Sequence, residues 1–196
     1  DEKRYDGVLL KHNSENLKSL LKNVLKNNYE TIQVTMAKAT LNDGQTLLAF
    51  NDFYIGADSH ISSRYTIQFG SKKEQQSSSG ILVSTGAGSS GWLSSVFNMA
   101  NNINNYNKRD KKNLKKTLDW DAQRLAFVVR EPFRSKMSQT TIGFGTISPK
   151  QKLKIESNMP SKGVIFSDGI ETDFLNFNSG SIVEIGIADE KANLIL

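Results

Sequence analysis

The sequence contains no cysteine and only three prolines and two histidines among its 196 residues. Without cysteine there can be no disulfide bond, thiolate metal site or cysteine nucleophile, and the composition fits a cytoplasmic protein. No apolar run approaches the roughly 18 residues that a membrane-spanning helix needs, so we expect no membrane partner. The first residues, DEKRYDGVLL, are charged at once and show neither a signal-peptide core nor an initiator methionine.

The formal net charge of +5 raises the question of a nucleic-acid partner. Much of the excess lies in one run, NKRDKKNLKK at 107–116, between two apolar segments. Such runs are usually solvated surfaces, and no aromatic residues alternate with these lysines as a base-stacking groove would require. We therefore expect no binding to nucleic acid.

One amphipathic helix is predicted near the start of the chain. Ser14 is a candidate N-cap, and Asn27-Asn28 marks the expected end. Apolar residues recur between them at the spacing of one helix face: Leu17, Leu20, Leu21, Val24 and Leu25.

Beyond residue 30 the apolar period changes to two, which indicates strands. Ile32, Val34 and Met36 alternate with polar residues, and the Asn-Asp-Gly at 42–44 predicts a hairpin turn. We expect roughly nine strands, a polar turn at GSKKEQQSSS (70–79), and a second helix after residue 91. Further strands are expected at 45–56, 65–69, 81–83, 124–129, 142–147, 153–155, 164–166 and 182–187. The fold class is therefore mainly β (α+β), a sandwich or closed sheet with helical additions.

The segment STGAGSSGW at 84–92 contains Gly-x-Gly-x-x-Gly, the dinucleotide-binding fingerprint. A Rossmann site also needs a βαβ unit and an acidic residue at the end of the next strand, about 20 residues on. The residue at that distance is Asp110, which lies in the lysine-rich run. A Walker A lysine is also missing, so the segment is either a ligand loop of another kind or a turn whose glycines serve packing.

Two acidic positions have both structural and functional interpretations. Asn51-Asp52 interrupts an apolar strand, where buried polar groups need partners. Asp168-Gly169 is typical of a hairpin turn. His12 and His60 have no neighbouring carboxylate, and we expect neither a catalytic triad nor a metal site.

In order along the chain, three segments resemble the C-terminal domain of the NAD kinase family. They are AFNDFYIG (49–56), SSGILVSTGAGSSGW (78–92) and GVIFSDG (163–169). The likeness is greatest to the mitochondrial-type branch, which shares the Ser-Ser-Arg at 62–64 and the Arg-Glu-Pro at 130–132. The resemblance implies the family's C-terminal β-sandwich. It implies a connecting segment and helix at 1–30 and a β-rich, NAD-binding and oligomerisation domain at 31–196.

For function, the resemblance implies phosphorylation of the adenosine ribose 2′-hydroxyl of NAD, with ATP and Mg²⁺, to make NADP. The NAD-binding residues carried over are Asn51, Asp52, Thr85, Ser90, Gly91, Trp92, Ser95 and Asp168. The family's Gly-Gly-Asp-Gly, whose aspartate is the expected general base, does not occur in this sequence. We therefore expect no catalytic residue and no metal ligand here, an N-terminal α/β domain missing from the chain, and negligible turnover by these residues alone.

Some alternatives stay open. Ser79-Gly80 stands where many family members have Asp-Gly, which puts the nicotinamide side of the site in doubt. A lipid kinase of the diacylglycerol or sphingosine type shares the broad architecture, and a non-catalytic regulatory nucleotide-binding module is a second alternative. The resemblance also implies a homo-oligomer, dimer or tetramer, in the cytoplasm of a bacterium or in a mitochondrion.

Overall fold

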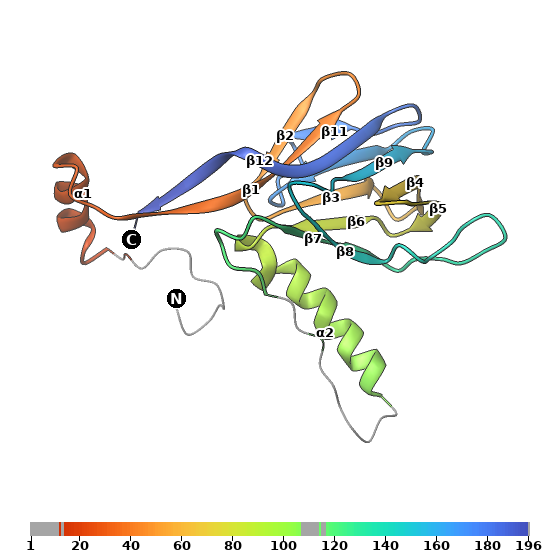
Figure 1. Cartoon of the computed structure of the whole chain (residues 1–196), viewed down its shortest axis with the longest axis horizontal. Coiled ribbons are helices and arrows are strands. Elements are labelled where there is room, and N and C mark those ends of the chain that lie inside the picture. Colours follow the sequence, from red (N-terminus) through yellow and green to blue (C-terminus); the bar gives the residue numbers. More distant parts are fainter. Residues whose placement is uncertain (1–11, 13, 107–113, 115–116, 196) are drawn as a thin grey trace.

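The computed structural model describes residues 12, 14–106, 114 and 117–195. In this part of the chain, twelve strands form two six-stranded antiparallel sheets, and two α-helices accompany them (Figure 1). The first sheet has the order β2 (Thr46–Ala49), β1 (Thr31–Leu41), β12 (Ile182–Ile195), β9 (Leu153–Ser157), β4 (Ser63–Phe69), β5 (Lys72–Ser78). The second has the order β11 (Phe174–Asn176), β10 (Gly163–Ser167), β3 (Asp52–Ala57), β6 (Ile81–Ser84), β7 (Leu125–Val129), β8 (Phe144–Ile147). The expected mainly β, sandwich class is confirmed.

The main core lies between the two sheets. Alternate residues of each strand point inward, so Phe53 and Ile55 of β3 contact the same cluster as Ile67 of β4 and Ile155 of β9. All four side chains are fully buried. The intervening residues of β3 face outward, and these outward positions carry the candidate site.

Strands β1 and β12 pair along their whole length and extend beyond the sandwich as a two-stranded ribbon (Figure 1). The register shifts between Thr35 and Ala37, and this bulge changes which side chains face inward. The predicted inward set is therefore only partly right: Val34 is buried, but Ala37 and Ala39 replace Met36 on the core side.

Helix α1 (Leu17–Leu25) lies at the tip of this ribbon. Its N-cap is Asn16, not the predicted Ser14, and the Asn16 side chain makes no capping hydrogen bond. None of its nine residues is buried in the described part of the chain, and Leu25 is 85% exposed. The predicted apolar face exists, but the described residues do not cover it.

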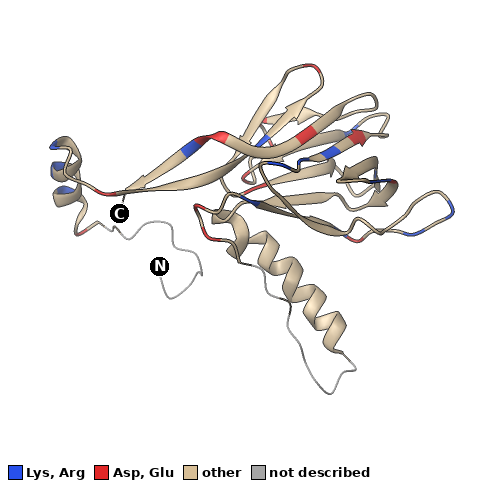
Figure 2. Ribbon diagram, in the orientation of Figure 1, with Lys and Arg blue, Asp and Glu red and all other residues tan. Residues whose placement is uncertain are grey.

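Helix α2 (Trp92–Asn105) contains no charged residue and runs from the outer face of the second sheet to beyond its edge (Figure 2). Leu93, Val96 and Phe97 pack on Leu82 and Ala126 of that sheet. Among the described residues the distal half of the helix has no such apolar support, and Ile103 is 71% exposed. The expected helix is confirmed, and its first half packs an apolar face on the sheet.

The polar segment predicted as a turn at 70–79 is mostly a strand. Only Gly70 and Ser71 form the turn, and β5 follows at Lys72. Its inward residues are polar: the Glu74 carboxylate accepts hydrogen bonds from the Ile142 N–H (2.8 Å) and the Gln76 amide (2.6 Å). Burial alone would raise the Glu74 pKa, but these bonds and one from the Thr141 hydroxyl hold it below its usual value.

Two other features concern charge and the membrane. Most of the lysine-rich run at 107–116 lies outside the described residues. Among the helices that are described, none combines the length and apolar character needed to cross a bilayer.

Candidate functional site

The candidate site is built where β2 of the first sheet gives way to β3 of the second. The sequence predicts a strand that ends or bulges at Asn51-Asp52, and here the chain changes sheets. The neighbouring turn at the end of β10 comes beside it, because the Asp168 N–H donates to the Asp52 carbonyl at 3.0 Å. Two acidic residues far apart in sequence therefore meet at one end of the second sheet.

Asp168 holds this crossover by its side chain. Its carboxylate accepts the backbone N–H groups of Phe50 (2.9 Å), Asn51 (2.6 Å) and Asp52 (3.2 Å). Asp168 has a φ of +55°, a left-handed conformation that aspartate tolerates better than most residues. The side chain thus fixes the position of Asn51-Asp52, and its oxygens are engaged by the protein itself.

Thr85 holds the same crossover from the opposite side. Its N–H donates to the Asn51 carbonyl at 2.9 Å, and its hydroxyl donates to the Phe50 carbonyl at 2.5 Å. The same hydroxyl accepts the Gly88 N–H at 3.2 Å, which ties the crossover to the short 3₁₀ helix η1 (Ala87–Ser90). Thr85 is fully buried and therefore positions the loop.

Two of the three fingerprint glycines are required by packing. A Cβ on Gly86 would lie 2.0 Å from the Asp119 carbonyl oxygen, and one on Gly88 would lie 2.1 Å from the Asn51 carbonyl oxygen. Gly91, in contrast, is exposed at the start of α2. The sequence predicts either a ligand loop or a turn whose glycines serve packing. Packing explains Gly86 and Gly88, whereas the end of the loop at Gly91 is open to solvent.

The Asp52 side chain is partly buried, and among the described residues its carboxylate has no hydrogen-bond donor. Burial raises the Asp52 pKa to about 6, with a further contribution from the negative charge of Asp168. A carboxylate kept without donors in the protein is suited to accept hydroxyl groups from a ligand.

Replacing Asp52 with asparagine is expected to stabilise the domain at neutral pH. Because the folded pKa is about 6 and the ordinary value is 3.8, the neutral form is favoured by folding. That stabilisation is complete below pH 3.8 and is lost as pH rises through 6, at a cost of up to about 3 kcal/mol. Asp52→Asn should therefore raise the melting temperature at pH 7.5 but not at pH 3.5.

Thermal unfolding followed by circular dichroism across this pH range measures the effect. The exposed carboxylate of Asp189, on the other sheet, provides the control variant Asp189→Asn, which should change the profile little. A lower melting temperature for Asp52→Asn at pH 7.5 would contradict the interpretation that burial and the Asp168 charge disfavour the ionised form of Asp52.

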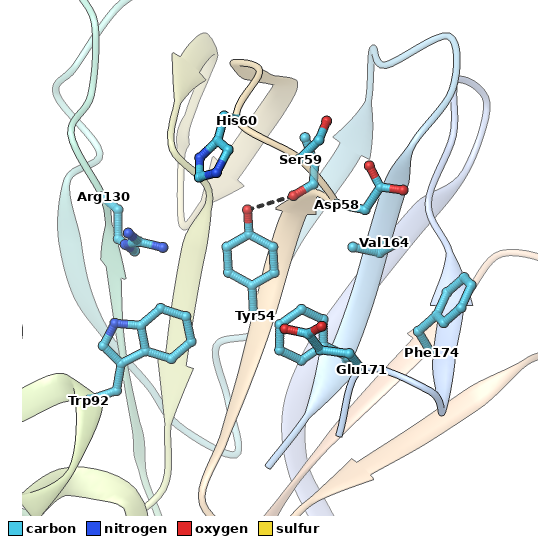
Figure 3. Close-up of a pocket in the computed structure, with 11 residues that line it drawn as sticks. Tyr54, Asp58, Ser59, His60, Trp92, Arg130, Val164, Glu171 and Phe174 are labelled. Atoms are coloured by element: carbon cyan, nitrogen blue, oxygen red, sulfur yellow. Dashed lines mark hydrogen bonds between the residues drawn. The ribbon is translucent and has the colours of Figure 1, made fainter. Parts of the chain in front are cut away.

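A pocket of about 420 Å³ lies next to Asp52 on the outer face of the second sheet (Figure 3). We call it the aromatic pocket, since Tyr54, Trp92, Phe166 and Phe174 line it. Tyr54 is two residues beyond Asp52 on β3, and Phe166 is its partner on β10, two residues before Asp168. Tyr54 and Phe166 in the pocket, and the acidic pair Asp52 and Asp168, thus occupy successive rows on one face of the sheet.

The Tyr54 ring forms the floor of the aromatic pocket. Gly56 and Gly80 leave the space that it fills, because a Cβ on either would come within 2.7 Å of the tyrosine side chain. The Tyr54 hydroxyl donates to the Ala57 carbonyl at 2.9 Å, which fixes the ring. Trp92 lies beside it, with ring centroids 6.0 Å apart and an interplanar angle of 10° (Figure 3).

The structure brings together some of the predicted site residues and separates others. Asn51, Asp52, Thr85 and Asp168 meet at the crossover, as described above. Trp92 lines the pocket, whereas Ser90, Gly91 and Ser95 lie exposed at the start of α2. The pocket residues Tyr54, Phe166 and Phe174 were not predicted. The signal for Tyr54 and Phe166 is the period-two spacing from Asp52 and Asp168, whereas Phe174 is on the next strand, β11, as the partner of Phe166.

No protein-family model and no curated protein sequence matches this chain. Among solved structures, the crystal structure of yeast NADH kinase complexed with NADH has a similar fold, with a TM-score of 0.67. The two are 13% identical in sequence, and the match covers 92% of this chain and 48% of the yeast chain. This chain spans about half the length of the yeast chain, and the likeness shows that it shares the fold of that part of the yeast protein.

Proposed function

We propose that this chain is the domain of an NAD kinase that binds the acceptor, the NAD to be phosphorylated. The observation that carries the proposal is the donor-free Asp52 carboxylate, held by the Asp168 and Thr85 contacts beside an aromatic pocket. The fold shared with an NADH kinase whose structure contains NADH supports the same assignment.

In this proposal the residues divide into two roles. Asp52 accepts hydrogen bonds from the ribose hydroxyls, and the Asn51 amide binds a base or phosphate oxygen. Ser90, Gly91 and Ser95 contact the ligand from the exposed start of α2, and Trp92 offers a ring face. Asp168 and Thr85 position this set through the backbone of the crossover.

In this proposal the phosphate donor, ATP, binds to a part of the enzyme other than the described residues. The Asp168 oxygens are engaged by three backbone N–H groups, and no group of three acidic or histidine side chains among the described residues could hold a metal ion. These residues therefore do not fit a protein-held Mg²⁺ site. We propose that Mg²⁺ enters with ATP, that residues 1–30 connect to the donor-binding domain, and that 31–196 also mediate assembly into a dimer or tetramer.

Two measurements test the proposal. Calorimetry with the 196-residue chain should detect NAD binding, and Asp52→Ala should weaken it at least tenfold, because the ribose hydroxyls lose their acceptor. The control Asp189→Ala, on the other sheet, should leave the affinity unchanged. A coupled assay should detect NADP formation by the longest natural form of the protein with ATP and Mg²⁺, and negligible turnover by residues 1–196 alone.

The outcomes separate the candidate functions. NAD binding without NADP formation by the longest natural form would favour the regulatory module. Absence of NAD binding to the folded chain would reject the acceptor-domain proposal.

A further inference from the structure

The aromatic pocket has the features of a site for a flat, positively charged ring. Tyr54 and Trp92 lie nearly parallel, and Phe166 continues the surface, with its ring centroid 5.0 Å from that of Tyr54. Phe174 lines the opposite side. Aromatic faces carry negative electrostatic potential, so a cage of this kind attracts organic cations, especially quaternary nitrogen groups.

Two carboxylates and one guanidinium line the pocket, together with the His60 imidazole. Asp58 and Glu171 both line it, and the pair Asp52 and Asp168 lies in the next row of the same sheet face. Arg130 is the one arginine or lysine among the lining residues, and its guanidinium lies 5.0 Å from the Trp92 ring centroid.

The ring contact of Arg130 is with one of the four aromatic residues of the pocket, Trp92. The Arg130 guanidinium is also 3.8 Å from the Glu131 carboxylate, which offsets its charge. Tyr54 lies farther along the pocket (Figure 3), and Phe166 lies next to Tyr54.

We infer that the aromatic pocket binds the nicotinamide ring of the dinucleotide in its oxidised form, and that the site therefore selects NAD⁺ over NADH. This inference rests on the proposed function. The oxidised ring is an N-alkylpyridinium cation, which gains from the aromatic faces and from Asp58 and Glu171. The reduced ring is neutral, so it can stack but lacks the attraction of a cation to the aromatic faces and to the carboxylates, and NADH brings one more net negative charge to the site.

The neutral adenine ring is the other candidate for the same pocket. It stacks on aromatic faces, but the two carboxylates at the rim do not attract it as a charge. Two half-molecules distinguish the rings: nicotinamide mononucleotide carries the pyridinium, and AMP carries the adenine.

The test measures NAD⁺ and NADH affinities of the 196-residue chain by calorimetry at pH 7.5. Wild type should bind NAD⁺ about tenfold more tightly than NADH, within the range of cation–aromatic contacts. Glu171→Gln and Asp58→Asn should each reduce this ratio about threefold, because the pyridinium of NAD⁺ loses an attractive carboxylate and the more negative NADH is repelled less. Asp173→Asn is the matched control, because Asp173 lies on the same turn as Glu171 but does not line the pocket.

Competition by the half-molecules identifies the ring. In the Tyr54→Leu variant, nicotinamide mononucleotide should lose affinity, and AMP should bind as in wild type. Loss of AMP affinity in that variant, with the mononucleotide unaffected, would overturn the inference in favour of adenine.

Other outcomes also decide the matter. Equal affinities for NAD⁺ and NADH, or a ratio unchanged in Glu171→Gln, would overturn the inference and leave the proposed function standing. Failure of both dinucleotides to bind would overturn the two together. Glu171 and Asp58 are exposed, so their variants are expected to fold even where Tyr54→Leu does not.

Discussion

Replacing Asp168 with alanine is expected to lower the free energy of unfolding by about 3 kcal/mol and to abolish dinucleotide binding. The variant leaves three backbone N–H groups, those of residues 50–52, without the carboxylate that accepts them. Hydrogen bonds to a charged group contribute about 1.5–3 kcal/mol each, and water that enters replaces part of that loss. For a domain of this size the melting temperature should fall by roughly 6–12 °C.

Two companion variants separate the carboxylate from the backbone conformation. Asp168→Asn retains one acceptor and tolerates the positive φ, so its loss of stability should be intermediate. Asp173→Ala removes an exposed carboxylate on the following turn and should have little effect. An Asp168→Ala protein with wild-type melting temperature and NAD affinity would show that the crossover does not depend on this side chain.

The Gly88→Ala substitution is expected to destabilise the domain by about 3 kcal/mol or more. A Cβ at this position would lie 2.1 Å from the Asn51 carbonyl oxygen, and that oxygen already accepts the Thr85 N–H and hydroxyl. Relief of the clash requires the loop and the crossover to separate, which also displaces Asp52. Overpacking ordinarily costs 1–3 kcal/mol, and a contact with fixed backbone lies at the upper end or beyond.

Gly186→Ala is the matched control for this effect. Its Cβ would have only ordinary contacts, the nearest at 3.6 Å to the flexible Lys152 side chain. Urea unfolding of the two variants should therefore give clearly different midpoints at similar slopes. Similar stabilities would mean that the loop can move without cost, contrary to the packing described for Gly88.

Much of the fold could be predicted because its inward residues are apolar and alternate. The hairpin at 42–44 was predicted from local turn chemistry, and Gly44 has the expected positive φ of +91°. Strand β5 could not be predicted in this way, since its inward residues are Glu74, Gln76 and Ser78. Their partners, such as Ile142, lie far away in sequence, so a local pattern contains no sign of them.

For the candidate site, the sequence indicated single residues better than their arrangement. The family resemblance selected Asp52 and Asp168, and the structure places them in contact although they are 116 residues apart. The Asp52 carboxylate has no donor among the described residues, and the Asp168 carboxylate accepts backbone N–H groups. This difference depends on the long-range pairing of β3 with β10. The aromatic pocket depends on the same strand pairing, which no local pattern in the sequence indicates.

The position of β12 in the first sheet has a consequence for synthesis on the ribosome. This strand runs from Ile182 to Ile195, yet it lies between β1 and β9 near the middle of its sheet. Until it leaves the exit tunnel, the facing edges of β1, which is made much earlier, and of β9 have no partner, and unpaired edges are sites of aggregation. We therefore expect the nascent chain to need chaperone protection until β12 has emerged, and shortened products ending before residue 182 to be degraded instead of folding.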